Sequence, residues 1–137
     1  MKKCIVLFLL ILPMIGSSQT KPVRVLFDIT SKDTLTHQAV LRHVKGMSAL
    51  YPNAQLEVVV YGGAWPMVVS GKSSMEGDIE KLTQAKNVSF KICAMTMDRF
   101  KVDKGNLIPG VQVVPDGILE IVTKQGEGWG YIKESHN

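Results

Sequence analysis

The chain is poor in cysteine, with only Cys4 and Cys93 among its 137 residues. Cys4 lies in a stretch typical of a removable export signal, so the mature protein would keep a single thiol. One thiol excludes an intramolecular disulfide, and exported proteins usually pair their cysteines or do without them. Cys93 is therefore either a reactive group or a small buried hydrophobe, and both readings stay open.

Long apolar runs are also scarce, and the one at the N-terminus is too short for a membrane helix. After the basic start Met1–Lys3, the run Ile5–Ile15 holds 11 apolar residues without a charge, whereas spanning a bilayer takes about 20. This pattern indicates a signal peptide rather than a retained anchor. Small residues before Gln19 suit signal peptidase, so we expect residues 1–18 to be removed.

The expected mature chain, residues 19–137, is long enough for one compact domain with a single core. Loss of Lys2 and Lys3 would lower the formal net charge from +4 to +2. No arginine-rich run or basic segment interleaved with aromatics occurs, which argues against a nucleic-acid surface. We expect a periplasmic or envelope protein that is soluble after cleavage, with no stable membrane anchor.

Metal and cofactor motifs are missing as well. His37 and His43 lie six residues apart, on different faces of a predicted helix, and we expect His37 to be a solvated helix residue. Gly71-Lys72-Ser73 has Pro66 where a phosphate-binding loop needs its first glycine. With one cysteine and no cluster of acids, the sequence predicts no metal site and no cofactor.

Short runs rich in β-branched residues predict strands. These runs are Val23–Ile29, Leu56–Val60, Val88–Cys93 and Val111–Val114, with Trp129–Ile132 as a possible fifth strand.

Helical periodicity fills the segments between these strands. The first helix is predicted between an N-cap at Asp33 or Thr34 and Pro52. Its expected apolar stripe is Val40, Val44, Met47 and Tyr51. Ser73 or Ser74 is expected to cap a second helix that buries Ile79 and Leu82. Asp116 is expected to cap a last helix that buries Ile118, Ile121 and Val122.

Alternation of strands and helices predicts an α/β fold with a mostly parallel sheet and helices on both faces. In such sheets every strand-to-helix turn lies at the carboxyl edge, where ligands and chemistry gather. Cys93 ends its strand and therefore lies at this edge. The other candidate binding residues there are Thr30, Ser31, Gly62, Gly63, Ala94, Thr96, Pro115 and Gly117.

The two hypotheses for Cys93, a reactive thiol and a structural cysteine, require different surroundings. A reactive thiolate requires access to solvent and nearby positive charge or helix amides, which the predicted helix at Ala94–Phe100, Arg99 and Lys101 could supply. A structural cysteine needs only burial at the end of a core strand.

Three segments resemble a known family. They are Val25–Ser31, Cys93–Thr96 and the tail, in which Leu107–Gly117 and Gln125–Lys133 are the most specific parts. On these residues the chain, from Val23 to Lys133, resembles the DsrE/DsrF-like proteins, particularly a small exported bacterial branch.

The resemblance implies a three-layer α/β/α sandwich around a five-stranded parallel sheet, and assembly into homotrimers or homohexamers. In relatives that act in sulfur oxidation and in sulfur relay for tRNA thiolation, a cysteine at the position of Cys93 carries sulfane sulfur as a persulfide. The resemblance thus implies that this chain is a sulfur-relay carrier that exchanges sulfur with a donor or acceptor protein. Two alternatives stay open: a ligand-binding or assembly module in which Cys93 is structural, and a thiol-dependent transferase.

Assembly is also expected from the residues themselves. A mature domain of this length has limited core to hold Trp65, Trp129 and Tyr131, so some of these side chains should lie in a subunit contact.

Overall fold

The computed structural model describes residues 21–135, so the expected signal peptide lies outside the described residues. The five strands form one parallel sheet in the order β4-β3-β2-β1-β5. Their bounds are β1 Arg24–Ile29, β2 Gln55–Val60, β3 Val88–Cys93, β4 Gln112–Val114 and β5 Gly130–Lys133. All five predicted strands are confirmed, and so is the α/β class.

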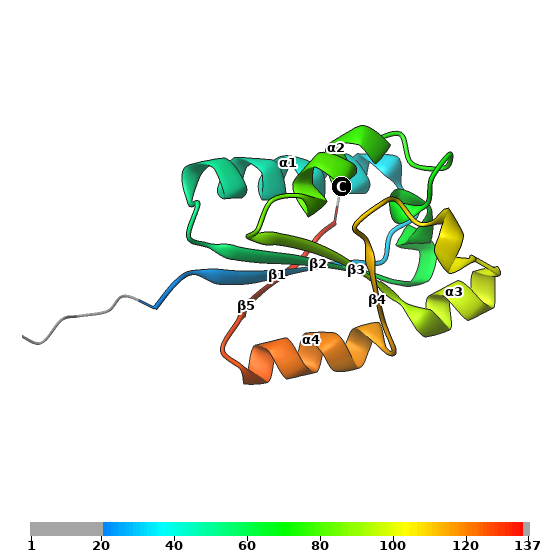
Figure 1. Cartoon of the computed structure of the whole chain (residues 1–137). Coiled ribbons are helices and arrows are strands. Elements are labelled where there is room, and N and C mark those ends of the chain that lie inside the picture. Colours follow the sequence, from blue (N-terminus) through cyan, green and yellow to red (C-terminus); the bar gives the residue numbers. More distant parts are fainter. Residues whose placement is uncertain (1–20, 136–137) are drawn as a thin grey trace, which may run out of the picture.

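Helices cover both faces of the sheet, with α1 and α2 on one side and α4 on the other (Figure 1). The α-helices are α1 Thr34–Leu50, α2 Glu76–Thr83, α3 Ala94–Phe100 and α4 Gly117–Gly126. Two 3-10 helices, η1 Gly62–Val68 and η2 Lys104–Asn106, connect them. No helix within residues 21–135 is both long enough and apolar enough to cross a membrane.

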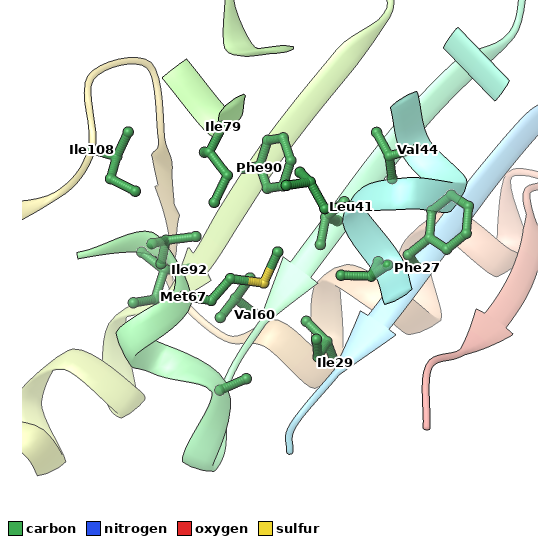
Figure 2. Close-up of a cluster of buried hydrophobic side chains, with 14 of the residues drawn as sticks. Phe27, Ile29, Leu41, Val44, Val60, Met67, Ile79, Phe90, Ile92 and Ile108 are labelled. Carbon is green, nitrogen blue, oxygen red and sulfur yellow. The ribbon is translucent and has the colours of Figure 1, made fainter. Parts of the chain in front are cut away.

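The larger core lies between the sheet and the layer of α1, α2 and η1. Because alternate residues of a strand point to opposite faces, Phe27 and Ile29 of β1 and Phe90 and Ile92 of β3 share this face, and all four are buried. Figure 2 shows these side chains in one cluster that also includes Leu41 and Val44 of α1, Ile79 of α2 and Met67 of η1. Apolar burial on this side provides most of the driving force for folding.

The opposite face is covered by α4 and has a small apolar cluster of Leu26, Val59 and Ile121. The alternate strand residues that share this face include Asp28, Glu57 and Lys91, three ionisable groups. The sheet therefore has one apolar face and one largely polar face.

Two predicted helices bury fewer residues than expected. In α4 only Ile121 of the predicted apolar side is buried, whereas Ile118 and Val122 are 60% and 59% exposed. The reason is that Glu120 and Lys124 of α4 also face the sheet, where they join the ion pairs described below. In α1, Val40 and Val44 are buried, but Tyr51 lies just beyond the helix as its C-cap and is 55% exposed.

The helix starts agree with prediction at Asp33 and Asp116, and differ at α2. Asp33 accepts a hydrogen bond from the amide of Leu35, and Asp116 accepts from those of Ile118 and Leu119. Helix α2 begins only at Glu76, because Ser73 uses its hydroxyl oxygen to accept from the amide of Met75 in the preceding turn (3.2 Å).

Candidate functional site

A cavity of about 240 Å³ opens at the carboxyl edge of the sheet, where the sequence places the candidate site. It lies among the end of β2, the junction of β3 with α3, and the start of α4. Its walls are Tyr61, Gly62, Cys93, Met95, Thr96, Arg99, Asp116 and Ile118. Three chain segments that are distant in sequence therefore meet around Cys93.

Cys93 ends β3 on the polar face of the sheet, and it is the N-cap residue of α3. The residue is only 4% exposed, so solvent reaches it only through the cavity. Gly117 leaves room for it: a Cβ at this position would lie 3.2 Å from the Cβ of Cys93 and 3.4 Å from Cγ1 of Val59. A side chain at residue 117 would therefore press on the thiol.

The charged residues of the cavity differ in how fully they are already paired. Asp116 uses Oδ1 to accept from two amides at the start of α4, at 2.8 and 3.3 Å. Arg99 lies in the last turn of α3 beside the ring of Phe100 (5.5 Å), and it forms none of the salt bridges within residues 21–135. Arg99 thus supplies positive charge to the cavity, as its sequence position suggested.

The loop after β2 is fixed against its neighbours by short backbone contacts. The amide of Gly62 donates to Oγ1 of Thr96 (3.0 Å), which joins this loop to α3. Gly62 has a positive φ of 57°, a conformation that favours glycine. At Gly63, a Cβ would approach the carbonyl oxygen of Thr30 to 3.1 Å. The two glycines therefore serve a tight turn that forms one wall of the cavity.

Some of the predicted candidate residues line the cavity with Cys93 and others do not. Gly62 and Thr96 line it, and Gly117 packs behind the thiol. The remaining candidates lie at the same edge but outside the cavity walls; they are Thr30, Ser31, Gly63, Ala94 and Pro115. Tyr61, Met95, Arg99, Asp116 and Ile118 complete the walls.

His37 is not the solvated helix residue that we expected. It is buried, and its Nε2 donates to the carbonyl oxygen of Ser31 (2.7 Å), because the first turn of α1 packs under the loop after β1. It therefore orders that loop, and it does not line the cavity of Cys93.

Next to the cavity, Asp28 is the buried centre of a polar network that sequence reasoning missed. Its carboxylate accepts from the hydroxyls of Tyr131 (2.7 Å) and Tyr61 (3.3 Å), and from Nζ of Lys133 (2.8 Å). Lys133 also donates to Oγ1 of Thr30 (2.9 Å). Because Tyr61 belongs to both groups, the network holds one wall of the cavity in place.

Two tyrosines of this network have strongly shifted acidity. Burial, with the nearby charge of Asp28, raises the pKa of Tyr61 to about 12. The hydrogen bond to Asp28, followed by burial, raises the pKa of Tyr131 to about 12. Both side chains therefore remain neutral hydrogen-bond donors at physiological pH.

A second network lies under α4, further from the cavity. Nζ of Lys91 contacts Oε2 of Glu57 (3.0 Å) and Oε1 of Glu120 (2.7 Å), and Lys124 lies 3.9 Å from Glu57. Burial raises the pKa of Glu57, whose Oε1 has no hydrogen-bond partner. Burial alone would lower the pKa of Lys91, but its bonds to the two carboxylates raise it. Lys91 is thus a cation on the same face of β3 as Cys93.

The register of β1 and β5 explains why the sequence did not reveal the Asp28 network. Asp28 lies opposite Lys133, and Leu26 opposite Tyr131, so alternate residues of β5 fall beside Asp28. The alternation of Tyr131 and Lys133 in the sequence was the available signal. Without the strand order, however, β5 could not be placed next to β1.

No group of three potential metal-ligating side chains occurs within residues 21–135. The cavity of Cys93 itself presents one thiol, the guanidinium of Arg99, the carboxylate of Asp116 and the polar groups of Tyr61 and Thr96.

Comparison with known proteins identifies the family. The model of the DsrE/DsrF-like family matches residues 25–133, which is most of the chain. The protein belongs to this family, as the three sequence segments suggested. The search of curated proteins gives no match.

Solved structures with the same fold agree with this assignment. The protein of unknown function MTH1491 from Methanobacterium thermoautotrophicum is 32% identical, with a TM-score of 0.75 over 81% of this chain and 98% of its own. The ychN protein from E. coli is 17% identical (TM-score 0.70, 82% and 99% covered), and BT1422 from Bacteroides thetaiotaomicron is 12% identical (0.65, 80% and 93%). The last two support the fold alone.

Proposed function

We propose that this DsrE/DsrF-like protein carries sulfane sulfur on Cys93 as a persulfide. The observation that supports this most is the position of Cys93, which ends β3 in a cavity at the carboxyl edge and has Arg99 in the cavity wall. A cation near a thiol favours the nucleophilic thiolate. A cysteine that only filled space would need neither the cavity nor the arginine.

The transfer needs only the thiol and a sulfur donor. The Cys93 thiolate attacks a sulfane sulfur of a polysulfide, a new S–S bond forms, and the shortened polysulfide leaves with the electron pair of the broken S–S bond. An acceptor thiolate then attacks the outer sulfur of the Cys93 persulfide and releases the Cys93 thiolate. No net oxidation occurs in either step, so a carrier of this kind needs no cofactor.

A mass measurement tests this proposal. The purified protein is exposed to polysulfide, treated with a persulfide-specific probe and digested, and we expect one added sulfur on the peptide containing Cys93. Cys93→Ser is the control for labelling at other sites. If wild-type protein gains no sulfur under conditions that modify a small free thiol, the carrier function is wrong and Cys93 is structural.

We also propose that the protein is a closed homo-oligomer, a trimer or hexamer. Trp65, Trp129 and Tyr131, which we expected in a subunit contact, also have partners within the chain. One group of exposed apolar side chains lies on α4 and α3. It consists of Ile118, Leu119 and Val122 with Met95, each about 60% exposed.

This exposed surface adjoins the cavity, because Met95 and Ile118 belong to both. A second subunit on α4 would bury the apolar residues and narrow the entrance to Cys93 in one step. Light scattering tests the assembly: a mass of about 13 kDa at micromolar concentration, the value expected for one mature chain from its length, would contradict it.

We propose, from the signal-like N-terminal sequence, that this chemistry takes place in the cell envelope. The test is N-terminal sequencing of protein from fractionated cells, in which export predicts a chain that starts at Gln19 in the envelope fraction. Full-length chain in the cytoplasmic fraction would contradict export without affecting the sulfur chemistry.

A further inference from the structure

A second cavity, of about 430 Å³, lies on the other side of the sheet, between α1 and the edge strand β5. It is larger than the cavity of Cys93 and within the range of about 300–1,000 Å³ typical of small-molecule sites. Its lining residues are Phe27, Arg42, His43, Gly46, Met47, Leu50, Ile132 and Glu134. Apolar side chains form most of the wall, which also includes three ionisable residues, Arg42, His43 and Glu134.

The ionisable residues form an ordered group. The side chain of Glu134 is 5% exposed and contacts Nδ1 of His43 at 2.7 Å, whereas the side chain of His43 is 56% exposed. Because an ionised carboxylate only accepts hydrogen bonds, Nδ1 must be the donor. Burying a carboxylate is unfavourable unless it is paired, and here the pair fixes the imidazole with Nε2 directed away from Glu134.

Arg42 adds a positive charge that no carboxylate of the described residues neutralises. It forms none of the salt bridges within residues 21–135. It also borders the space towards α2, but Asp78 there is already paired with Lys45 (3.1 Å). Because Nδ1 of His43 donates to Glu134, Nε2 of the neutral ring can only accept a hydrogen bond. The guanidinium of Arg42 is therefore the group in this wall that suits an anion.

Gly46 is an exposed glycine inside α1 that lines this cavity. A glycine inside a helix costs roughly 0.5–1 kcal/mol relative to alanine. Packing within the chain does not explain it, because a Cβ at Gly46 would have no atom within 4 Å. A methyl group therefore fits at this position, whereas a large side chain would extend over the cavity lined by Met47 and Ile132.

The geometry points to a binding site for a single-chain aliphatic carboxylate, with its carboxylate at Arg42 and its chain against Met47, Leu50 and Ile132. The cavity volume of about 430 Å³ lies in the lower part of the range of about 300–1,000 Å³ for small-molecule sites. That size matches a chain of medium length such as decanoate. The site is separate from Cys93, so it does not depend on the sulfur-carrier function.

Calorimetric titration with sodium decanoate, on protein purified after expression of the full chain, tests this site. We expect saturable binding that is unchanged in Cys93→Ser. Gly46→Trp would fill the cavity and is expected to weaken binding at least tenfold, while Gly46→Ala places only a methyl group in open space and should stay within about threefold. Arg42→Gln removes the charge-assisted contact and should cost about tenfold.

Other outcomes would overturn the inference. Wild-type protein that gives no saturable signal, or Gly46→Trp that binds decanoate as wild type does, would exclude the cavity as the site. Equal affinity for 1-decanol would show that Arg42 does not recognise a carboxylate. A lower assembly mass for Gly46→Trp, but not for Gly46→Ala, would mean that a second copy of the chain occupies the groove.

Discussion

The two faces of the sheet are built on different principles. The face under α1 and α2 is a continuous apolar core, with Phe27 and Phe90 fully enclosed. The face under α4 has three buried apolar residues and two networks of ionisable groups, centred on Asp28 and Lys91. Cys93 lies on this second face.

This difference separates stability from function within one small domain. An apolar face gains free energy roughly in proportion to the area that it buries. Buried ion pairs add little net stability, because desolvation offsets much of their attraction. They do fix side chains in position, and here the fixed side chains include Tyr61, which forms part of the Cys93 cavity. The following variants test this division, from the largest expected effect to the smallest.

Phe90→Ala should have the largest effect, because it leaves a cavity in the apolar core. Phe90 is fully buried, and such truncations cost about 3–5 kcal/mol of the free energy of unfolding. Denaturant titration followed by circular dichroism measures the loss. Phe100→Ala, at a half-exposed ring, is the matched control and should cost about 1 kcal/mol or less. Equal effects of the two variants would show that the apolar face does not dominate stability.

Lys91→Met should cost about 3 kcal/mol, because it leaves the buried carboxylate of Glu57 without its closest cation. The double variant Lys91→Met with Glu57→Gln removes both charges and should recover much of the loss. This recovery is the signature of an ion pair rather than of packing. If the loss in free energy of unfolding for the double variant equals the sum of the losses for the two single variants, the two charges do not stabilise each other. The network would then contribute to stability through side-chain packing alone.

Asp28→Asn should lower the alkaline stability of the protein. The pKa values of Tyr61 and Tyr131 are raised to about 12, against about 10 in unfolded chains. Because the folded state favours the protonated tyrosines, they contribute to the free energy of unfolding. This contribution is fully present below pH 10 and is lost as the pH rises through about 12.

Ultraviolet absorbance of the phenolate measures these titrations directly. Asn at residue 28 removes the negative charge, so we expect both tyrosines to titrate closer to pH 10, with a stability loss at neutral pH of about 1–2 kcal/mol. Tyr131→Phe should remove one of the two late titrations and leave that of Tyr61. Wild-type protein in which every tyrosine titrates near pH 10 would contradict the network.

Much of the fold could be predicted because β-branched runs and caps are local signals. Asp33 and Asp116 mark helix starts that the structure confirms. The position of Cys93 at the carboxyl edge also followed, because parallel strands share that edge. Contacts between residues distant in sequence could not be predicted. The Asp28 network depends on the register of β1 with β5, and the sheet-facing side of α4 depends on Lys91 of β3. Neither is encoded in a local pattern.

Leu119→Gln should have the smallest effect on the single chain and a clear effect on its assembly. Leu119 is exposed on α4, so the free energy of unfolding of one subunit should change by no more than about 0.5 kcal/mol. If α4 forms the subunit contact, the same change places an amide in an apolar interface, and light scattering should show dissociation at a higher protein concentration than for wild type. Leu35→Gln, on the exposed side of α1, is the matched control and should leave the assembly mass unchanged. If wild-type protein assembles and Leu119→Gln has the same assembly mass, the subunit contact lies elsewhere. The entrance to the Cys93 cavity beside α4 would then not be covered by a second subunit.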